Sequence, residues 1–77
     1  MENLEYTVVL EPNGDEPGYT VTVPALPGCV SCGETLEEAL ENIRDAIALW
    51  IRLAKKQGEP VPADTAVVSK VRVSIAA

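Results

Sequence analysis

A single long amphipathic pattern over residues 36–57 constrains this chain more than any other feature. Apolar side chains recur there at the spacing of one face of an α-helix, at Leu36, Leu40, Ile43, Ile47, Trp50 and Ala54. Thr35 and Glu38 fit a capping box, in which the Thr35 hydroxyl accepts from the Glu38 amide and the Glu38 carboxylate accepts from the Thr35 amide. A helix with one apolar face must pack on a second layer, and we expect that layer to be a sheet.

Four segments around this helix have the composition of β-strands. Residues 6–10 and 29–31 are rich in β-branched and aromatic or small side chains, and residues 19–23 and 67–75 alternate between apolar and polar positions. Turn-forming residues separate the first two segments, and prolines interrupt the chain before the third. The predicted order is βββαβ, which is typical of an α+β domain.

The predicted sheet is mixed and four-stranded, with strand order 3-2-1-4. A right-handed crossover through the helix would place the last strand parallel to the first and beside it. One helix covers only one face of such a sheet, so we expect an open face lined by Thr20, Thr22, Lys70 and Arg72. No repeat or linker divides the chain, and we expect residues 1–77 to form one domain.

Charge and apolar runs limit the partners of this chain. Its formal net charge is −6, and a surface of that sign repels phosphate backbones, so we expect no direct binding of nucleic acid. The first residues are acidic, unlike a secretory leader, and the longest apolar run, residues 46–51, is too short to span a bilayer. We therefore expect a cytoplasmic protein without a membrane partner.

The sequence offers little for catalysis or for binding a cofactor. It has no histidine, which excludes Ser-His and Cys-His nucleophile pairs. Cys29 and Cys32 have Cys-x-x-Cys spacing, but in an extended segment their Cα atoms would lie about 10 Å apart, too far for a disulfide. They supply two of the four ligands of a zinc site, which only a dimer could complete. We expect packed or exposed thiols, no catalytic residue, no metal site and no cofactor.

Three segments, residues 5–12, 18–29 and 33–43, resemble the HicB antitoxin domain in order and spacing. The most specific parts are the Pro-Ala-Leu-Pro-Gly-Cys corner at residues 24–29 and the helix entry at residues 35–39. The candidate family-motif positions are Tyr19, Pro24, Leu26, Pro27, Gly28, Cys29, Gly33, Thr35, Glu38 and Ala39.

This resemblance implies a partial RNase H-like fold and a protein-binding module that binds and neutralises HicA, a small basic toxin that cleaves mRNA. Many members carry a C-terminal DNA-binding module. The sequence ends directly after the last predicted strand, so we expect no separate C-terminal DNA-binding domain here. The candidate acidic face for the toxin comprises Glu11, Asp15, Glu16, Glu34, Glu37 and Glu41.

Two other hypotheses remain open at this point. One is a stand-alone oligomeric scaffold or sensing domain without a toxin partner. The other is a metal-dependent nuclease of the RNase H type, which needs several converging carboxylates, one of them in the first strand. Residues 6–10 contain no carboxylate, so we expect no enzyme. The small size and the open sheet edges predict a homodimer or a larger even homo-oligomer.

Overall fold

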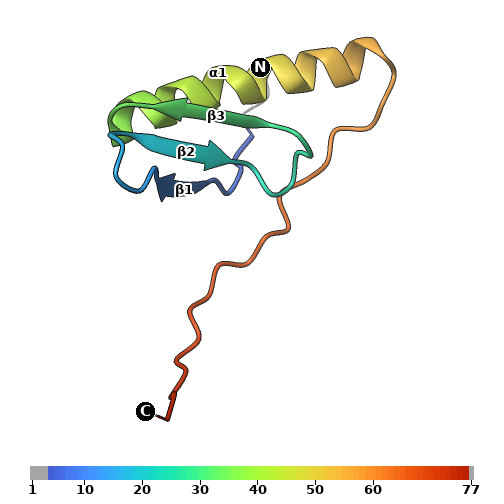
Figure 1. The fold of residues 1–77 in the computed structure, drawn as a ribbon. Helices are drawn as coiled ribbons and strands as arrows, with labels where there is room; N and C mark the ends of the chain where they lie inside the picture. The colour runs from blue at the N-terminus through green and yellow to red at the C-terminus, as the bar shows by residue number, and fades with distance from the viewer. Residues whose placement is uncertain (1–3, 77) are drawn as a thin grey trace.

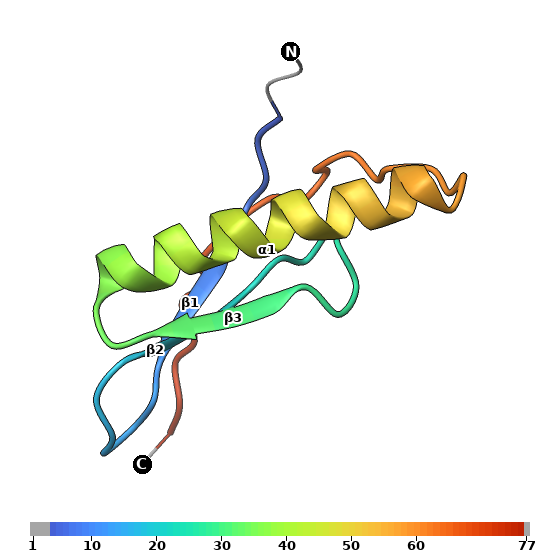
Figure 2. The ribbon, with the colours of Figure 1, turned by 90° about the horizontal axis from the view of Figure 1, so that it is seen from above.

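The computed structural model describes residues 4–76, which contain three strands and one helix. They follow in the order β1 (Val9–Pro12), β2 (Tyr19–Thr22), β3 (Val30–Gly33) and α1 (Leu36–Lys56). The strands form one antiparallel sheet in the order β1-β2-β3, and α1 lies across one face of it (Figure 1). Figure 2 shows the same arrangement from above, with α1 crossing over the strands. An α+β fold with one helix on one face of a sheet is therefore confirmed.

The central strand β2 separates a buried face of the sheet from an open one. Val21 lies opposite Leu10 on β1 and Ser31 on β3, and its side chain is fully buried toward α1. Thr20 and Thr22 alternate to the opposite face, where both are exposed. The open face predicted for Thr20 and Thr22 is confirmed, whereas Lys70 and Arg72, predicted to line the same face, lie in an extended segment outside the sheet.

The core lies between α1 and the sheet. It consists of Val21, Val23, Leu26, Cys29, Ala39 and Ile43, and half-buried side chains of Tyr6, Val8, Leu10, Tyr19, Ala46, Ile47 and Trp50 pack around it. Leu26 and Val21 are its largest fully buried side chains. The predicted helix stripe and the inward face of β2 thus meet in one cluster, as the two periodicities require.

The ends of α1 are fixed by local hydrogen bonds. The Glu38 amide donates to the Thr35 hydroxyl at 3.0 Å, as predicted. The Glu38 carboxylate, however, accepts from the amide of Glu34 at 3.4 Å rather than from that of Thr35. At the other end Gly58, with φ +72°, donates to the Lys55 carbonyl, and Glu59 donates to that of Ala54. This pair of bonds is the Schellman arrangement that a glycine after a helix permits.

The first strand begins three residues later than predicted. Val23, which would lie opposite Val8 in this register, donates its N–H to the Cys29 carbonyl at 3.2 Å. That bond draws the backbone into the proline corner and ends the ladder at Thr22. The third strand, predicted over residues 29–31, covers Val30–Gly33: the same bond occupies the Cys29 carbonyl, and the ladder with β2 continues to the pair of Tyr19 and Gly33.

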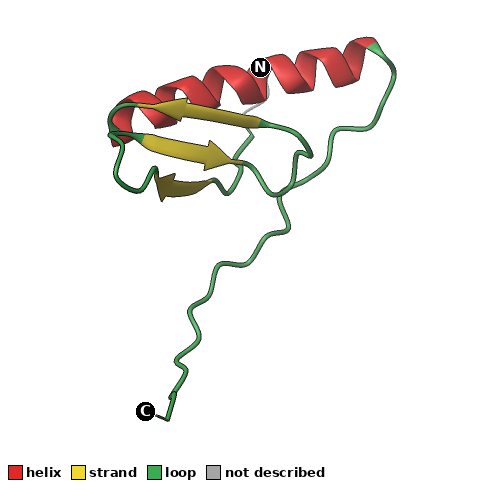
Figure 3. Cartoon of the chain, in the orientation of Figure 1, coloured by secondary structure: helices red, strands yellow, loops and turns green. Residues whose placement is uncertain are grey.

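The C-terminal segment differs most from the prediction. Residues 67–75 are extended but form no ladder with the described strands, and they run away from the sheet (Figures 1 and 3). The structure therefore has a three-stranded antiparallel sheet where the sequence predicts a mixed four-stranded one. An alternating pattern indicates a segment that can become a strand, whereas the strand itself requires a neighbour for its N–H and C=O groups.

Candidate partner-binding surface

Two loops that are distant in sequence meet at one end of the molecule. The β1–β2 loop is closed by a bond from the Asn13 amide to the Gly18 carbonyl and by one from the Thr20 hydroxyl to the Asn13 side chain. Gly18 packs against the chain that leaves β3: a Cβ there would lie 2.6 Å from the Gly33 carbonyl oxygen and 3.3 Å from the Glu34 Cα. The tip of the β-hairpin is thereby held beside the entry to α1.

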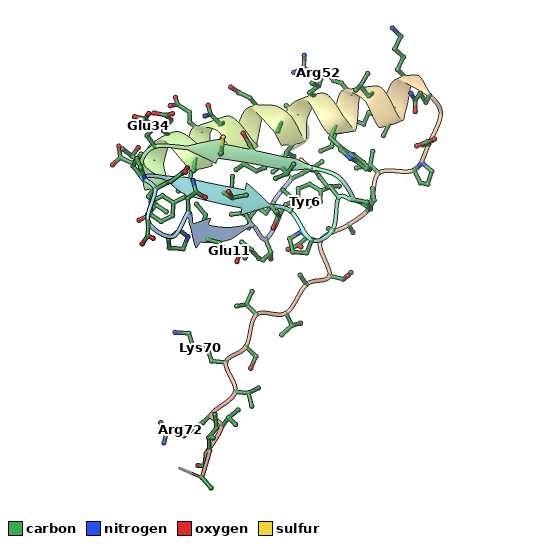
Figure 4. The ribbon with its side chains drawn as sticks, in the orientation of Figure 1. Tyr6, Glu11, Glu34, Arg52, Lys70 and Arg72 are labelled. Atoms are coloured by element: carbon green, nitrogen blue, oxygen red, sulfur yellow. The ribbon has the colours of Figure 1, made fainter. Side chains whose placement is uncertain are left out.

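Five of the six predicted acidic positions belong to these loops and to the first turns of α1. They are all exposed: Asp15, Glu16, Glu34, Glu37 and Glu41. Together we call them the acidic end. Glu11 does not join them, because it alternates with the core-packed Leu10 and points to the open face of the sheet (Figure 4). Carboxylates in a first helical turn also stabilise the helix dipole, and this local role holds for Glu37.

Five of the six basic side chains lie elsewhere, while Arg44 follows Glu41 by three residues on α1. Lys55 and Lys56 occupy the last turn of α1, and Arg52 precedes them by one turn. Lys70 and Arg72 belong to the extended C-terminal segment, residues 66–75, which we call the tail. Figure 4 shows Glu34 near one end of α1 and Arg52 toward the other. The acidic end is therefore separated from these cations in space as well as in sequence, and its charge is available to attract a basic protein surface over about a Debye length.

The proline corner, residues 24–29, contributes the side chain of Leu26 to the core. Leu26 is fully buried, and its amide and carbonyl bond to Val23 and Cys29 at 3.1 and 3.0 Å. The Trp50 indole donates to the Pro27 carbonyl at 3.0 Å and so ties the corner to α1. Trp50 belongs to the predicted apolar stripe of the helix, and the structure adds this polar contact, which no local pattern indicates.

Four of the five remaining motif positions shape the β3–α1 connection, and the fifth, Tyr19, is a half-buried residue of β2 opposite Gly33. Gly33 is buried against α1 so closely that a Cβ there would collide with the amide nitrogen of Ala39 and lie 2.7 Å from its Cα. Ala39 is itself fully buried, while Thr35 and Glu38 make the helix cap. Gly33, Thr35, Glu38 and Ala39 therefore maintain the junction between β3 and α1, beside which the acidic end is exposed.

The two cysteines are free thiols in different surroundings. Cys29 is buried in the corner, and burial raises the pKa of its thiol, whereas Cys32 is exposed on β3. Among residues 4–76 no three His, Cys, Asp or Glu side chains are grouped so that they could hold a metal ion. No helix in the same range has the length and hydropathy needed to cross a membrane.

Alkylation of the native protein at mildly alkaline pH is expected to modify Cys32 at least about tenfold faster than Cys29. The thiolate is the reactive form, and Cys29 has both a raised pKa and little access to solvent. Peptide mass spectrometry after a time course gives the two rates. In denaturant the rates should converge. Equal rates in the native protein would contradict the buried position of Cys29.

An apolar hollow beside the first strand was not predicted. It has a volume of about 240 Å³, lies between α1 and the segment that enters β1, and is lined by Leu4, Tyr6, Val8, Leu40, Ile43, Arg44 and Ile47. A wider hollow of about 640 Å³ continues along α1 past Ile51 and Arg52. Helical periodicity places Leu40, Ile43 and Ile47 on the inward face of α1, but whether a further element covers them depends on the tertiary fold.

Comparison with known proteins gives one consistent family. Residues 6–74 match the family described as HicB_like antitoxin of bacterial toxin-antitoxin system. A UPF0150 protein of Thermoplasma acidophilum is 48% identical over 64 residues, which are 82% of this chain and 90% of that protein. A UPF0150 protein of Synechocystis sp. is 35% identical over 74 residues, which are 96% of this chain and all of that protein. Antitoxin HicB 1 of Photorhabdus laumondii is 37% identical over 62 residues, 80% of this chain and 39% of that protein.

Proposed function

This chain belongs to the HicB-like antitoxin family of bacterial toxin–antitoxin systems, and from that premise we propose that it binds and neutralises a small basic toxin of the HicA type, an mRNA-cleaving protein. The observation that carries the proposal is the acidic end. Asp15, Glu16 and Glu34 are exposed there beside the first turns of α1, on a chain with net charge −6. Opposite charge accelerates the encounter of two proteins and helps to set their orientation.

The proposed mechanism is occlusion without catalysis. The sequence contains no histidine to serve as the base of a Ser-His or Cys-His pair, and family membership favours a regulatory protein. We also propose a cytoplasmic location, no direct contact with nucleic acid, and a fold related to RNase H in part. Cleavage of an RNA/DNA hybrid by the pure protein with Mg²⁺ or Mn²⁺ would overturn the non-enzymatic mechanism.

A stand-alone oligomeric role is the second candidate function. It is favoured by the exposed apolar side chains of the tail, among them Val67, Val71 and Ile75, since such a row on a soluble protein marks a contact surface. Under this alternative the chain forms a homodimer or a larger even homo-oligomer and needs no toxin. The two functions are compatible, because the tail leaves the fold on the side of β1 and not at the acidic end (Figure 1).

Reversing one charge at the acidic end tests the toxin-binding proposal. The partner is the product of a small basic reading frame adjacent to the gene, co-expressed and purified with this chain. Glu34→Lys is expected to weaken the complex about fivefold at low salt, mainly through slower association, because the charge lies at the rim of the contact. Titration calorimetry and stopped-flow mixing give the affinity and the association rate.

Glu59→Lys is the matched control, since Glu59 is an exposed glutamate just beyond the other end of α1. It changes the net charge by the same amount and is expected to leave affinity nearly unchanged. If the two variants weaken the complex equally, the acidic end is not the binding surface. If co-expression gives no complex at all, the toxin-binding proposal fails for that pair.

A further inference from the structure

The tail, residues 66–75, has the pattern of a strand but forms no ladder with any other segment of residues 4–76. Val67 is 90% exposed, Val71 84%, Val73 71% and Ile75 87%, and Lys70, Arg72 and Ser74 alternate with the last three. β-branched side chains at every second position are typical of a half-buried strand and not of a solvated terminus. The tail therefore has the sequence of a strand and lacks the neighbour that would make it one.

The outer edge of β1 lacks a neighbour in the same way. β1 is bonded to β2 on one side only, so the outward N–H and C=O groups of Val9–Pro12 have no ladder partner among the described residues. α1 packs chiefly on β2 and β3, and the hollow of about 240 Å³ along Leu40, Ile43 and Ile47 lies between α1 and the segment that enters β1. One further strand beside β1 would pair this edge and cover that hollow.

We propose that residues 66–75 form that strand in a second copy of the chain, so that two copies exchange their tails reciprocally. Val71, Val73 and Ile75 then face the apolar hollow beside Tyr6 and Val8. Lys70 and Arg72 alternate to the open face of the sheet, which is also the face of Glu11. One register therefore places the apolar side chains of the tail against the hollow and its basic side chains on the face of Glu11. The exchange does not depend on toxin binding.

The path of the chain favours exchange over closure on its own β1. The Tyr6 hydroxyl donates to the Pro62 carbonyl at 2.6 Å, and the Thr7 hydroxyl donates to the Asp64 carboxylate at 2.8 Å. These bonds hold residues 62–64 beside the segment that enters β1, and beyond them the tail leaves the body instead of following the strand (Figure 1). Reciprocal exchange pairs both edges and both tails in one closed two-fold assembly, which is the usual form of a homodimer. A small hydrophobic core gains most from such a supplement.

A lysine at an inward position of the tail tests the exchange. Light scattering across a micromolar dilution series is expected to show a dimer for the unchanged chain. Val73→Lys should raise the concentration at half dissociation about tenfold or more, because a charged side chain would enter the apolar hollow. Ser74→Lys adds the same side chain one position along, on the open face, and should leave the dimer intact. Circular dichroism reports whether the helix persists in each variant.

Mixed dimers separate exchange from closure. A dimer of one ¹⁵N-labelled and one ¹³C-labelled copy should give intermolecular NOEs between the tail of one chain and β1 of the other. A monomeric mass with protected tail amides would show that the tail closes on its own chain and would overturn the proposal. A dimer that Val73→Lys leaves unchanged would overturn it as well. No toxin is present in these measurements, so failure to bind toxin leaves their outcome unaffected.

Discussion

Replacing Gly33 with alanine is expected to lower the free energy of unfolding by about 3–5 kcal/mol, a large part of the stability of a domain this small. The added Cβ would collide with the Ala39 amide nitrogen and lie 2.7 Å from the Ala39 Cα and 2.8 Å from the Glu38 carbonyl carbon. All three atoms belong to the backbone of α1, which cannot rotate away as a flexible side chain can. Only Glu34 and Thr35 connect β3 to α1, so the helix cannot retreat without breaking its cap.

Gly14→Ala is the control for the effect of adding a methyl group to a glycine. Gly14 has φ +67°, but a Cβ there would meet no atom within 4 Å. The only cost is the left-handed backbone conformation, about 1–2 kcal/mol. Urea unfolding of both variants at one protein concentration gives the comparison. If both variants lose the same free energy of unfolding, β3 and α1 do not approach as closely as the structure shows.

Local patterns predicted most of the body of this fold. The stripe from Leu36 to Ala54 gave the helix to within a residue of its observed end, because caps and periodicity act over a few residues. The alternation around Val21 gave the central strand and its open face. The corner residues 24–29 interrupt the sheet where the prolines indicated. In each of these cases the deciding interactions lie close together in sequence.

The contacts that were not predicted join distant parts of the chain. The Tyr6 hydroxyl bonds a carbonyl 56 residues away, and the bond from Trp50 to Pro27 spans 23 residues. The alternation in residues 67–75 is real, but nothing local specifies which edge it pairs with or in which chain. The acidic face was likewise predicted from sequence charge alone. Hairpin geometry brings Asp15 and Glu16 toward Glu34, whereas strand alternation sends Glu11 to the other face.

Truncating Leu26 to alanine is expected to cost about 3–4 kcal/mol of unfolding free energy, within the usual range for a fully buried leucine. Leu26 has the largest fully buried side chain among residues 4–76, with 0% exposure. Hydrogen bonds from its amide and to its carbonyl fix the backbone of the corner at Val23 and Cys29. Because that backbone is fixed, the corner cannot collapse into the space left by the side chain, and the cavity remains.

Leu49→Ala removes the same atoms from the exposed side of α1, where Leu49 is 55% exposed. The Leu49→Ala substitution changes the apolar surface exposed to water less and leaves no closed cavity. Its free energy of unfolding should therefore fall by less than about 1 kcal/mol. Urea unfolding followed by Trp50 fluorescence reports both variants, since the indole contacts the corner through Pro27. A Leu26→Ala protein as stable as the Leu49→Ala protein would show that the corner is a surface loop. Packing of Leu26 would then not explain why residues 24–29 resemble the corner of the HicB antitoxin domain.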